Sequence, residues 1–344
     1  MLQRQSSVVF LAASIDACAL LRLFLPQWNF PGSSFFCFAQ RPDWNKIAGM
    51  DVAVVQRCCT QPQFDFLRTA RALGIKLIYD LDDDVWDLPE YNPAHKMFMA
   101  YRDGFTACIQ GVDLVTVSTK FLRKQVKKNV RNLVNVFTGK EIPIVVAENR
   151  LDFKMLGAPV YKERFTIGWQ GSSSHIGDLT IIEESLRRLC HEYYKTVDFE
   201  FRGCDPPPGL RLMQNVHHKM WMPVSEYMMR MPRFGWHIAL APLSDHPFND
   251  SKSPLKMLEA GYCRIPCLAS WVKPYVEFCE HDDELKWLLC AGPSAWYPKL
   301  RELINDDARR KFLGERMHAV VTEHYSFCKP HEGWRTAIDM ALEN

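Results

Sequence analysis

The stretch FNDSKSPLKMLEAGYCRIPCLAS, residues 248–270, predicts a loop, a helix and a buried strand in succession. Ser253 suits the N-cap position, Pro254 suits the first helical position, and apolar residues recur after them at helical spacing. The helix is therefore expected to begin near Pro254. The apolar run that follows it, up to Ser270, is typical of a strand buried in a parallel sheet.

The first turn of this predicted helix is suited to binding an anion. It offers unpaired N–H groups and the positive end of the helix dipole, with Lys252 just before it and Lys256 on it. Glu259 follows one turn along the same face, where its carboxylate can accept hydrogen bonds from paired sugar hydroxyls. A diphosphate at the tip and a ribose one turn further along describe a bound nucleotide. The turn that would contact it is Ser253, Pro254 and Leu255.

The same stretch resembles the C-terminal domain of retaining, group 1-like glycosyltransferases of the GT-B fold, in their bacterial and phage-type branch. In that family a helix ends in Glu and small residues, here Glu259-Ala260-Gly261, before a proline-containing strand. Similar segments are YDLDDDVWDLP at 79–89, VDLVTVST at 112–119, IGWQGSSSH at 167–175 and FRG at 201–203. The resemblance implies an α/β protein with two Rossmann-like doubly wound domains facing a central cleft. Ser251 departs from the family, which has a Glu there.

Length and composition agree with two domains. The chain has 344 residues, of which 47% are hydrophobic and 24% charged, enough for two separate cores. The expected division is residues 1–158 as an acceptor domain and 159–325 as a nucleotide-sugar domain. By resemblance, residues 326–344 should form a helix that packs back on the first domain. The net charge of +2 excludes a uniformly basic nucleic-acid-binding protein.

The cysteines and the hydropathy of the chain indicate in which cellular compartment the protein is expected. The 12 cysteines lack paired CxxC spacing, which favours buried free thiols in a reducing compartment and a cytoplasmic protein. The apolar run at 8–13 imitates a signal peptide, but Asp16 interrupts it and the run also suits a first strand. No uncharged apolar stretch is long enough to predict a transmembrane segment.

The first half of the chain carries candidate residues for the acceptor side. Asp80, Asp82 and Asp83 follow a predicted strand, and doubly wound sheets bind ligands at the carboxyl ends of their strands. These carboxylates suit a divalent metal, a hydrogen-bonding role or helix capping. The resemblance favours no metal and no cofactor, because GT-B enzymes generally stabilise the leaving diphosphate with cations and helix dipoles. Arg22 resembles an acceptor-facing Arg of the family, with a helix salt bridge as the alternative.

Residues 120–131 predict an amphipathic helix with one strongly basic face. The cations on that face are Lys120, Arg123, Lys124, Lys127, Lys128 and Arg131. Lys124 and Lys128 are assigned to the acceptor side. Three interpretations remain open: a solvated face, a contact with the phosphates of DNA, or a contact with an anionic membrane that carries a lipid-linked acceptor.

The second half supplies the donor side. Gly171 and Ser172 lie in a small polar turn after a predicted strand, where backbone amides can approach a phosphate, and His175 closes that turn. Arg202 ends the next strand and suits bidentate pairing with a diphosphate. Trp221 is expected to form a wall near the base. The alternatives are a structural role for His175, a surface ion pair for Arg202 and a place in the core for Trp221.

These observations predict a metal-independent enzyme that moves a sugar from a nucleotide diphosphate sugar to a hydroxyl with retention. Arg202, Lys252, Lys256 and Glu259 would carry the chemistry, and a glycan or envelope polysaccharide is the expected acceptor. One alternative is a DNA glycosyltransferase that acts on a hydroxymethylated base. The other is a GT-B relic that binds nucleotide sugar or glycan without transfer, favoured by Ser251.

Overall fold

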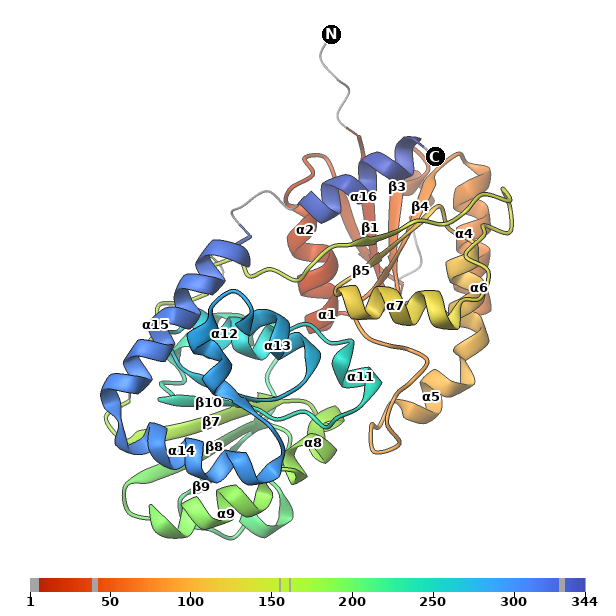
Figure 1. Ribbon diagram of the computed structural model, residues 1–344. Helices are drawn as coiled ribbons and strands as arrows, with labels where there is room; N and C mark the ends of the chain where they lie inside the picture. The colour runs from red at the N-terminus through yellow and green to blue at the C-terminus, as the bar shows by residue number, and fades with distance from the viewer. Residues whose placement is uncertain (1–5, 39–42, 155, 161, 328–331, 344) are drawn as a thin grey trace.

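The chain folds into two α/β domains, each built on a six-stranded parallel sheet (Figure 1). This computed structural model describes residues 6–38, 43–154, 156–160, 162–327 and 332–343. The first sheet has the order β2-β1-β3-β4-β5-β6. Its strands are β1 (Val8–Ala12), β2 (Ser34–Cys37), β3 (Val52–Gln56), β4 (Lys76–Leu81), β5 (Leu114–Val117) and β6 (Ile144–Val146).

Buried apolar runs explain the first sheet. Every residue of β1, β3 and β5 is buried, as expected of parallel strands covered by helices on both faces. Parallel pairing aligns Val9 with Ala53, and Val54 with Ile78. The connecting helices are α1 (Ala17–Ala19), α2 (Leu25–Gln27), α3 (Trp44–Ile47), α4 (Gln61–Ala72), α5 (His95–Ala100), α6 (Arg102–Gln110) and α7 (Lys120–Asn129), with a π-helical turn between α1 and α2.

The second sheet has the order β12-β11-β10-β7-β8-β9. Its strands are β7 (Phe165–Gly171), β8 (Val197–Gly203), β9 (Val216–Lys219), β10 (Ile238–Ala241), β11 (Cys267–Ser270) and β12 (Leu289–Cys290). Its helices are α8 (Ile176–Thr180), α9 (Glu183–Glu192), α10 (Val224–Arg230), α11 (Pro247–Asp250), α12 (Leu255–Tyr262), α13 (Lys273–Cys279), α14 (Trp296–Asn305) and α15 (Asp307–His324). Two doubly wound parallel sheets confirm the predicted pair of Rossmann-like domains.

The last helix, α16 (Glu332–Glu343), returns to the first domain. Figure 1 shows α16 over the first sheet, whereas α15 runs along the second domain. Trp334 is fully buried, with its ring 6.0 Å from that of Phe10 and 5.2 Å from the Arg22 guanidinium carbon. The end of the chain therefore stabilises the core of the first domain.

In each sheet the chain order reverses beside a central strand, at β1/β3 and at β7/β10. Such switch points open a crevice outside the carboxyl ends of the strands, where α/β proteins bind ligands. In the second sheet, the turn after β7 and the loop after β10 come from this position. The fold thus predicts a site at these two loops.

Candidate active site

A cavity of about 260 Å³ lies between the two domains, at the ends of β7 and β8. Its wall from the first domain includes Cys18 and Asp83. Predicted donor-side residues in its lining are Gly171, Ser172, His175, Arg202, Trp221, Lys252, Leu255, Lys256 and Glu259. Its described lining does not include Ser253, Pro254, Arg22, Asp80, Asp82, Lys124 or Lys128. The structure therefore brings most of the predicted donor residues together and leaves most of the predicted acceptor residues outside.

Helix α12 begins one residue later than the sequence predicts, and its first turn carries no side-chain cap. Pro254 takes the N-cap position, which the sequence assigned to Ser253. The Ser253 hydroxyl instead accepts a hydrogen bond of 2.8 Å from the Asn149 side-chain amide in the first domain. A contact between domains has replaced the local cap, so no side chain caps the first turn of α12, whose Leu255 and Lys256 line the cavity.

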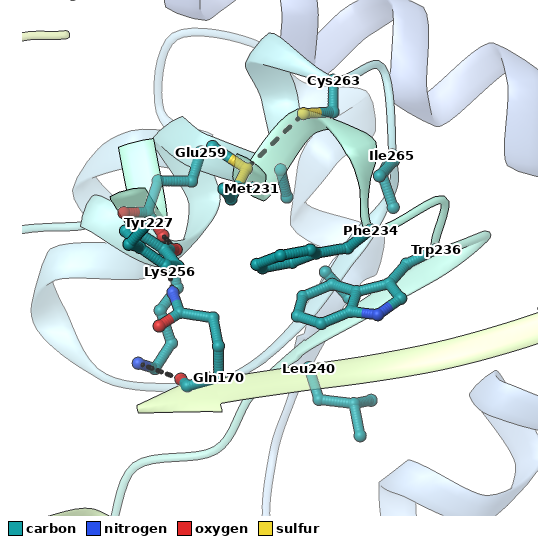
Figure 2. A pocket seen from close by; sticks show the side chains of 12 residues that line it. Gln170, Tyr227, Met231, Phe234, Trp236, Leu240, Lys256, Glu259, Cys263 and Ile265 are labelled. Carbon is teal, nitrogen blue, oxygen red and sulfur yellow. Dashed lines mark hydrogen bonds between the residues drawn. The ribbon is translucent and has the colours of Figure 1, made fainter. Parts of the chain in front are cut away.

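Lys256 and Glu259 lie together on the first turns of α12 (Figure 2). Lys256 Nζ donates to the Gln170 carbonyl oxygen at 2.8 Å, and burial lowers the pKa of Lys256 to about 8. Glu259 Oε2 accepts from Gln170 Nε2 at 2.6 Å and from the Tyr227 hydroxyl at 2.8 Å. Burial raises the pKa of Glu259 to about 7, against the opposing effect of Lys256. Both charges are poorly solvated, which makes them sensitive to a charged ligand.

Lys252 spans the boundary between the domains. Its Nζ lies 3.5 Å from Asp83 Oδ1 and 4.3 Å from the centre of the Phe248 ring. Both partners of the ion pair are partly exposed, with side-chain exposures of 16% and 27%, so solvent weakens their attraction. An incoming anion can therefore compete with Asp83 for this ammonium group.

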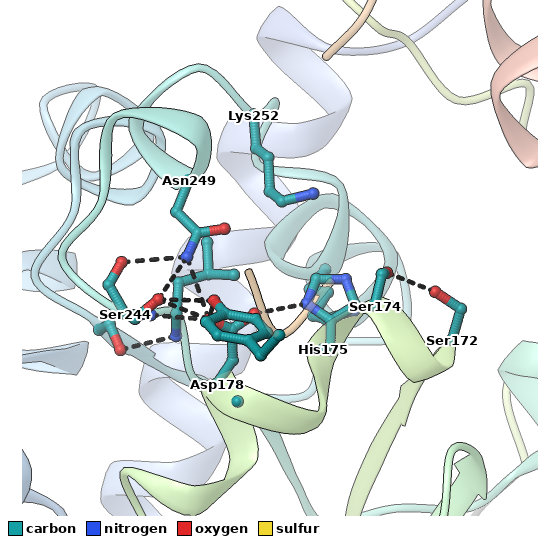
Figure 3. A network of polar contacts seen from close by, with 12 residues as sticks. Ser172, Ser174, His175, Asp178, Ser244, Asn249 and Lys252 are labelled. Carbon is teal, nitrogen blue, oxygen red and sulfur yellow. Dashed lines mark hydrogen bonds and ion pairs between the residues drawn. The ribbon is translucent and has the colours of Figure 1, made fainter. Parts of the chain in front are cut away.

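His175 is held by a buried carboxylate that the sequence analysis did not single out (Figure 3). Its Nδ1 lies 2.8 Å from Asp178 Oδ2, and Asp178 is only 1% exposed. Burial and nearby Lys256 lower the pKa of His175 to about 4, so the ring is neutral near pH 7. Because the Asp178 carboxylate requires a donor, we assign the proton to Nδ1. Nε2 is then an acceptor, which suits a sugar hydroxyl better than a phosphate oxygen.

Asp178 also connects the two domains. Its Oδ1 accepts from the Tyr91 hydroxyl at 2.9 Å, the Ser244 backbone N–H at 2.9 Å and Asn249 Nδ2 at 3.0 Å. Tyr91 belongs to the first domain and lies against α8, since a Cβ on Gly177 would be 2.6 Å from its ring. No periodicity in the sequence relates these residues, although Asp178 three positions after His175 is a spacing that could have suggested the pair.

Arg202 makes its contacts within the second domain. Its Nε donates to Glu200 Oε1 at 2.7 Å, and its guanidinium carbon lies 3.8 Å from the centre of the Phe234 ring. Gly171 and Gly203 keep the wall open beside it. A Cβ on Gly171 would be 2.7 Å from the Trp169 ring, and Gly203 has a φ of +91°, which favours glycine. The orientation of the Arg202 guanidinium is thus fixed, and Glu200 partly neutralises its positive charge.

Arg22 and Asp80 form a buried ion pair, and neither residue belongs to the cavity lining. Arg22 Nη2 lies 2.7 Å from Asp80 Oδ1, and both side chains are fully buried. Asp80 also accepts from Thr116 Oγ1 at 2.8 Å, while Arg22 Nη1 donates to Asn149 Oδ1 at 3.1 Å. The structure therefore assigns this pair a structural role in place of the predicted contact with an acceptor.

Asp82 and Asp83 lie nearer the cavity, beside Cys18. Single ligand atoms of these three residues lie within 4.8 Å of one another, so they are the group among the described residues that could hold a metal ion. Burial raises the pKa of Asp82 to about 6, while Arg57 opposes the shift. Arg57 also pairs with Asp16 at 2.8 Å. This guanidinium already supplies positive charge to the cluster, and the absence of a metal stays a prediction.

Comparisons with known proteins bear on the fold. No protein-family model and no curated protein matches the chain. Among solved structures, Anabaena HepE in complex with UDP-glucose matches with a TM-score of 0.67 and 12% identity over 98% of both chains. Sucrose-phosphate synthase from Thermosynechococcus elongatus matches with a TM-score of 0.64 and 10% identity, over 98% of this chain and 97% of the other.

A third match has a different described activity. A UDP-N-acetylglucosamine 2-epimerase from Listeria monocytogenes matches with a TM-score of 0.57 and 12% identity, over 99% of this chain and 97% of the other. Matches along nearly the whole length of each chain confirm the GT-B fold that residues 248–270 predicted. At these identities the likeness concerns the fold, and function has to be argued from the site.

Proposed function

We propose that this chain is a glycosyltransferase that moves a sugar from a nucleoside diphosphate sugar to a hydroxyl acceptor, with retention and without a metal ion. The observation that carries the proposal is the grouping of Lys252, Lys256 and Glu259 around the uncapped start of α12, inside a cavity between two Rossmann-like domains. Two cations and free N–H groups suit a diphosphate, and a carboxylate one turn further along suits ribose hydroxyls.

The other lining residues suit the sugar. Nε2 of neutral His175 can accept a hydrogen bond from a sugar hydroxyl, because Asp178 holds the opposite ring nitrogen. Ser172 and Ser174, whose hydroxyl oxygens are 2.6 Å apart, add donors and acceptors at the same turn. Ser251 cannot serve in place of the family's Glu, since it is fully buried and its hydroxyl donates to the Pro247 carbonyl.

The reaction asks mainly for stabilisation of charge and for positioning. The bond between the anomeric carbon and the diphosphate oxygen breaks, and a bond to the acceptor oxygen forms on the same face of the sugar. The acceptor proton passes to the departing phosphate. Lys252 and Lys256 would stabilise the growing negative charge, while Asp83 across the cavity would orient the acceptor hydroxyl. Retention itself is proposed from the resemblance of residues 248–270 to retaining enzymes.

A glycan is the proposed acceptor, and modified DNA is the second candidate. The observation in favour of DNA is the basic face of α7, whose cations are all exposed. Phosphate contacts of this kind hold proteins on a duplex without reading its sequence.

Hydrolysis of the donor tests the proposal without knowledge of the acceptor. UDP-glucose is the first donor to try, because HepE was crystallised with it. We expect slow release of UDP that persists with a chelator and disappears in Lys256→Met. Abolition by the chelator would instead favour a metal at Cys18, Asp82 and Asp83. Binding of UDP-glucose without any turnover, with or without candidate acceptors, would favour a relic that only binds. Failure to bind any nucleotide sugar would contradict both.

A further inference from the structure

The outer face of α7 carries positive charge that no described residue neutralises with a salt bridge. The segment 120–131 holds six cations and no acidic residue. All six are exposed, and no salt bridge or hydrogen bond of their side chains occurs within the described part of the chain. Lys120 and Lys124 act on Glu277 only through space, by opposing the rise of its pKa. Like charges gathered without partners repel each other, so an external anionic partner would stabilise them.

The turn that follows α7 presents apolar side chains beside this charge. Val134, Val136 and Phe137 have exposures of 42%, 59% and 41%. The turn is well held, because Asn135 Nδ2 donates to the Val112 carbonyl at 2.8 Å and Asn135 Oδ1 accepts from the Phe137 N–H at 2.9 Å. Phe137 also stacks on Phe64 with ring centres 5.9 Å apart, which fixes the turn further and leaves Val134 and Val136 as its aliphatic groups toward solvent.

The start of α6 brings further apolar groups to the same region. Arg102 Nη2 donates to Asn129 Oδ1, at the end of α7, over 3.4 Å. Tyr101, which precedes Arg102 in the chain, is 43% exposed. Met97 on α5 is 53% exposed, one turn before Tyr101. In Figure 1, α5, α6 and α7 all belong to the first domain, and α7 lies close to the second domain.

We propose that this surface, formed by α7, the 131–141 turn and the α5–α6 junction, binds the surface of an anionic lipid bilayer. Cations beside exposed aromatic and aliphatic groups match the headgroup region, where anionic phosphates border the acyl chains. A DNA backbone would satisfy the cations but would offer no apolar contact to Val134 and Val136, which are 42% and 59% exposed. No helix of the described chain is long and apolar enough to span a membrane.

Contact with a membrane would limit the chemical class of the sugar acceptor. If the proposed transferase activity holds, on which this step rests, a lipid-linked glycan is the acceptor class that the bilayer would present. The donor cavity lies at the domain boundary, where α7 also begins, since Thr119 Oγ1 donates to the Ser251 carbonyl at 2.9 Å. A bilayer bound along α7 would therefore lie near the cleft.

Vesicle sedimentation tests the surface. The full chain should sediment with vesicles of phosphatidylcholine containing phosphatidylglycerol and stay in solution with phosphatidylcholine alone. Each cation near an anionic surface contributes about five-fold in affinity, so Lys127→Glu combined with Arg131→Glu should weaken binding at least about 25-fold. The matched control is Lys195→Glu with Lys219→Glu, which reverses two exposed lysines of the second domain and should bind as the unaltered protein does. Val136→Asn should weaken binding by removing an apolar contact, because it changes no charge.

The outcomes separate this proposal from the proposed function. Equal binding to neutral vesicles, or no effect of Lys127→Glu with Arg131→Glu, overturns the membrane surface. Tighter, salt-sensitive binding to duplex DNA than to anionic vesicles overturns it in favour of a nucleic-acid partner. Hydrolysis of UDP-glucose is measured on the same variants and should be unchanged, because none of the substituted residues lines the cavity. Vesicle binding without donor hydrolysis in any variant would sustain the surface and contradict the transferase.

Discussion

Replacing Lys256 by Met removes a cation from the first turn of α12 while keeping a long unbranched side chain. The ammonium has two neutral partners, the Gln170 carbonyl at 2.8 Å and the Trp169 ring, whose centre is 5.5 Å away, and burial lowers its pKa to about 8. A poorly solvated charge acts strongly on a developing diphosphate. We therefore expect the loss that follows removal of one preorganised charge contact, about 3 to 4 kcal/mol, or roughly a hundred- to thousand-fold in kcat.

The assay is the initial rate of UDP release, with the melting temperature measured on the same samples. Burial disfavours the protonated lysine in the folded state, so Lys256→Met should not lower the melting temperature at pH 7. Lys299→Met is the matched control. Lys299 Nζ also donates to backbone carbonyls, those of Trp287 and Leu289, each at 2.6 Å, but it lies outside the cavity lining. A Lys256→Met rate within about three-fold of the Lys299→Met rate would refute the phosphate assignment.

Three further outcomes are expected. Glu259→Gln should weaken UDP binding about ten-fold in calorimetry, because a neutral amide accepts hydrogen bonds less strongly than a carboxylate, and unchanged affinity would remove the ribose assignment. UDP affinity should be highest between about pH 7, above which Glu259 is ionised, and about pH 8, below which Lys256 is protonated; a flat profile would contradict this pairing. Tyr91→Phe should speed amide hydrogen exchange in residues 244–253 and leave the sheet cores unchanged, since it removes the hydroxyl that bonds Asp178; equal exchange would show that this hydroxyl does not hold the loop.

Local patterns predicted the parts of this protein that local forces determine. The uninterrupted apolar runs of β1 and β3 indicated buried parallel strands, and the basic face of α7 followed from helical spacing. Both features follow from the spacing of apolar and charged residues along the chain and from the preference of charged groups for water. The start of α12 was wrong by one residue because the Ser253 hydroxyl bonds Asn149 instead of capping its own helix.

Contacts between distant segments were beyond the reach of the sequence. Arg22 and Asp80 are 58 positions apart and form an ion pair in the core. Both residues were expected on the acceptor side, but they are buried inside the first domain. The carboxylate that orients His175 was missed although Asp178 is only three positions away, whereas its bonds from Tyr91 and from Asn249 on α11 join distant parts of the chain. Contacts between side chains from distant segments produce no periodic pattern in the sequence. The cations next to α12, in contrast, could be predicted from their position at the start of that helix.

The turn that carries Lys252 is anchored in the opposite domain at three consecutive positions. Ser251 accepts from Thr119 at 2.9 Å, Lys252 lies 3.5 Å from Asp83, and Ser253 accepts from Asn149 at 2.8 Å. Under the proposed function, diphosphate binding at this turn is therefore coupled to the contacts between the domains. By reciprocity, whatever free energy the diphosphate adds to those contacts, the contacts add to the affinity for the diphosphate. On that proposal, Thr119 and Asn149 contribute to donor affinity although neither lines the cavity.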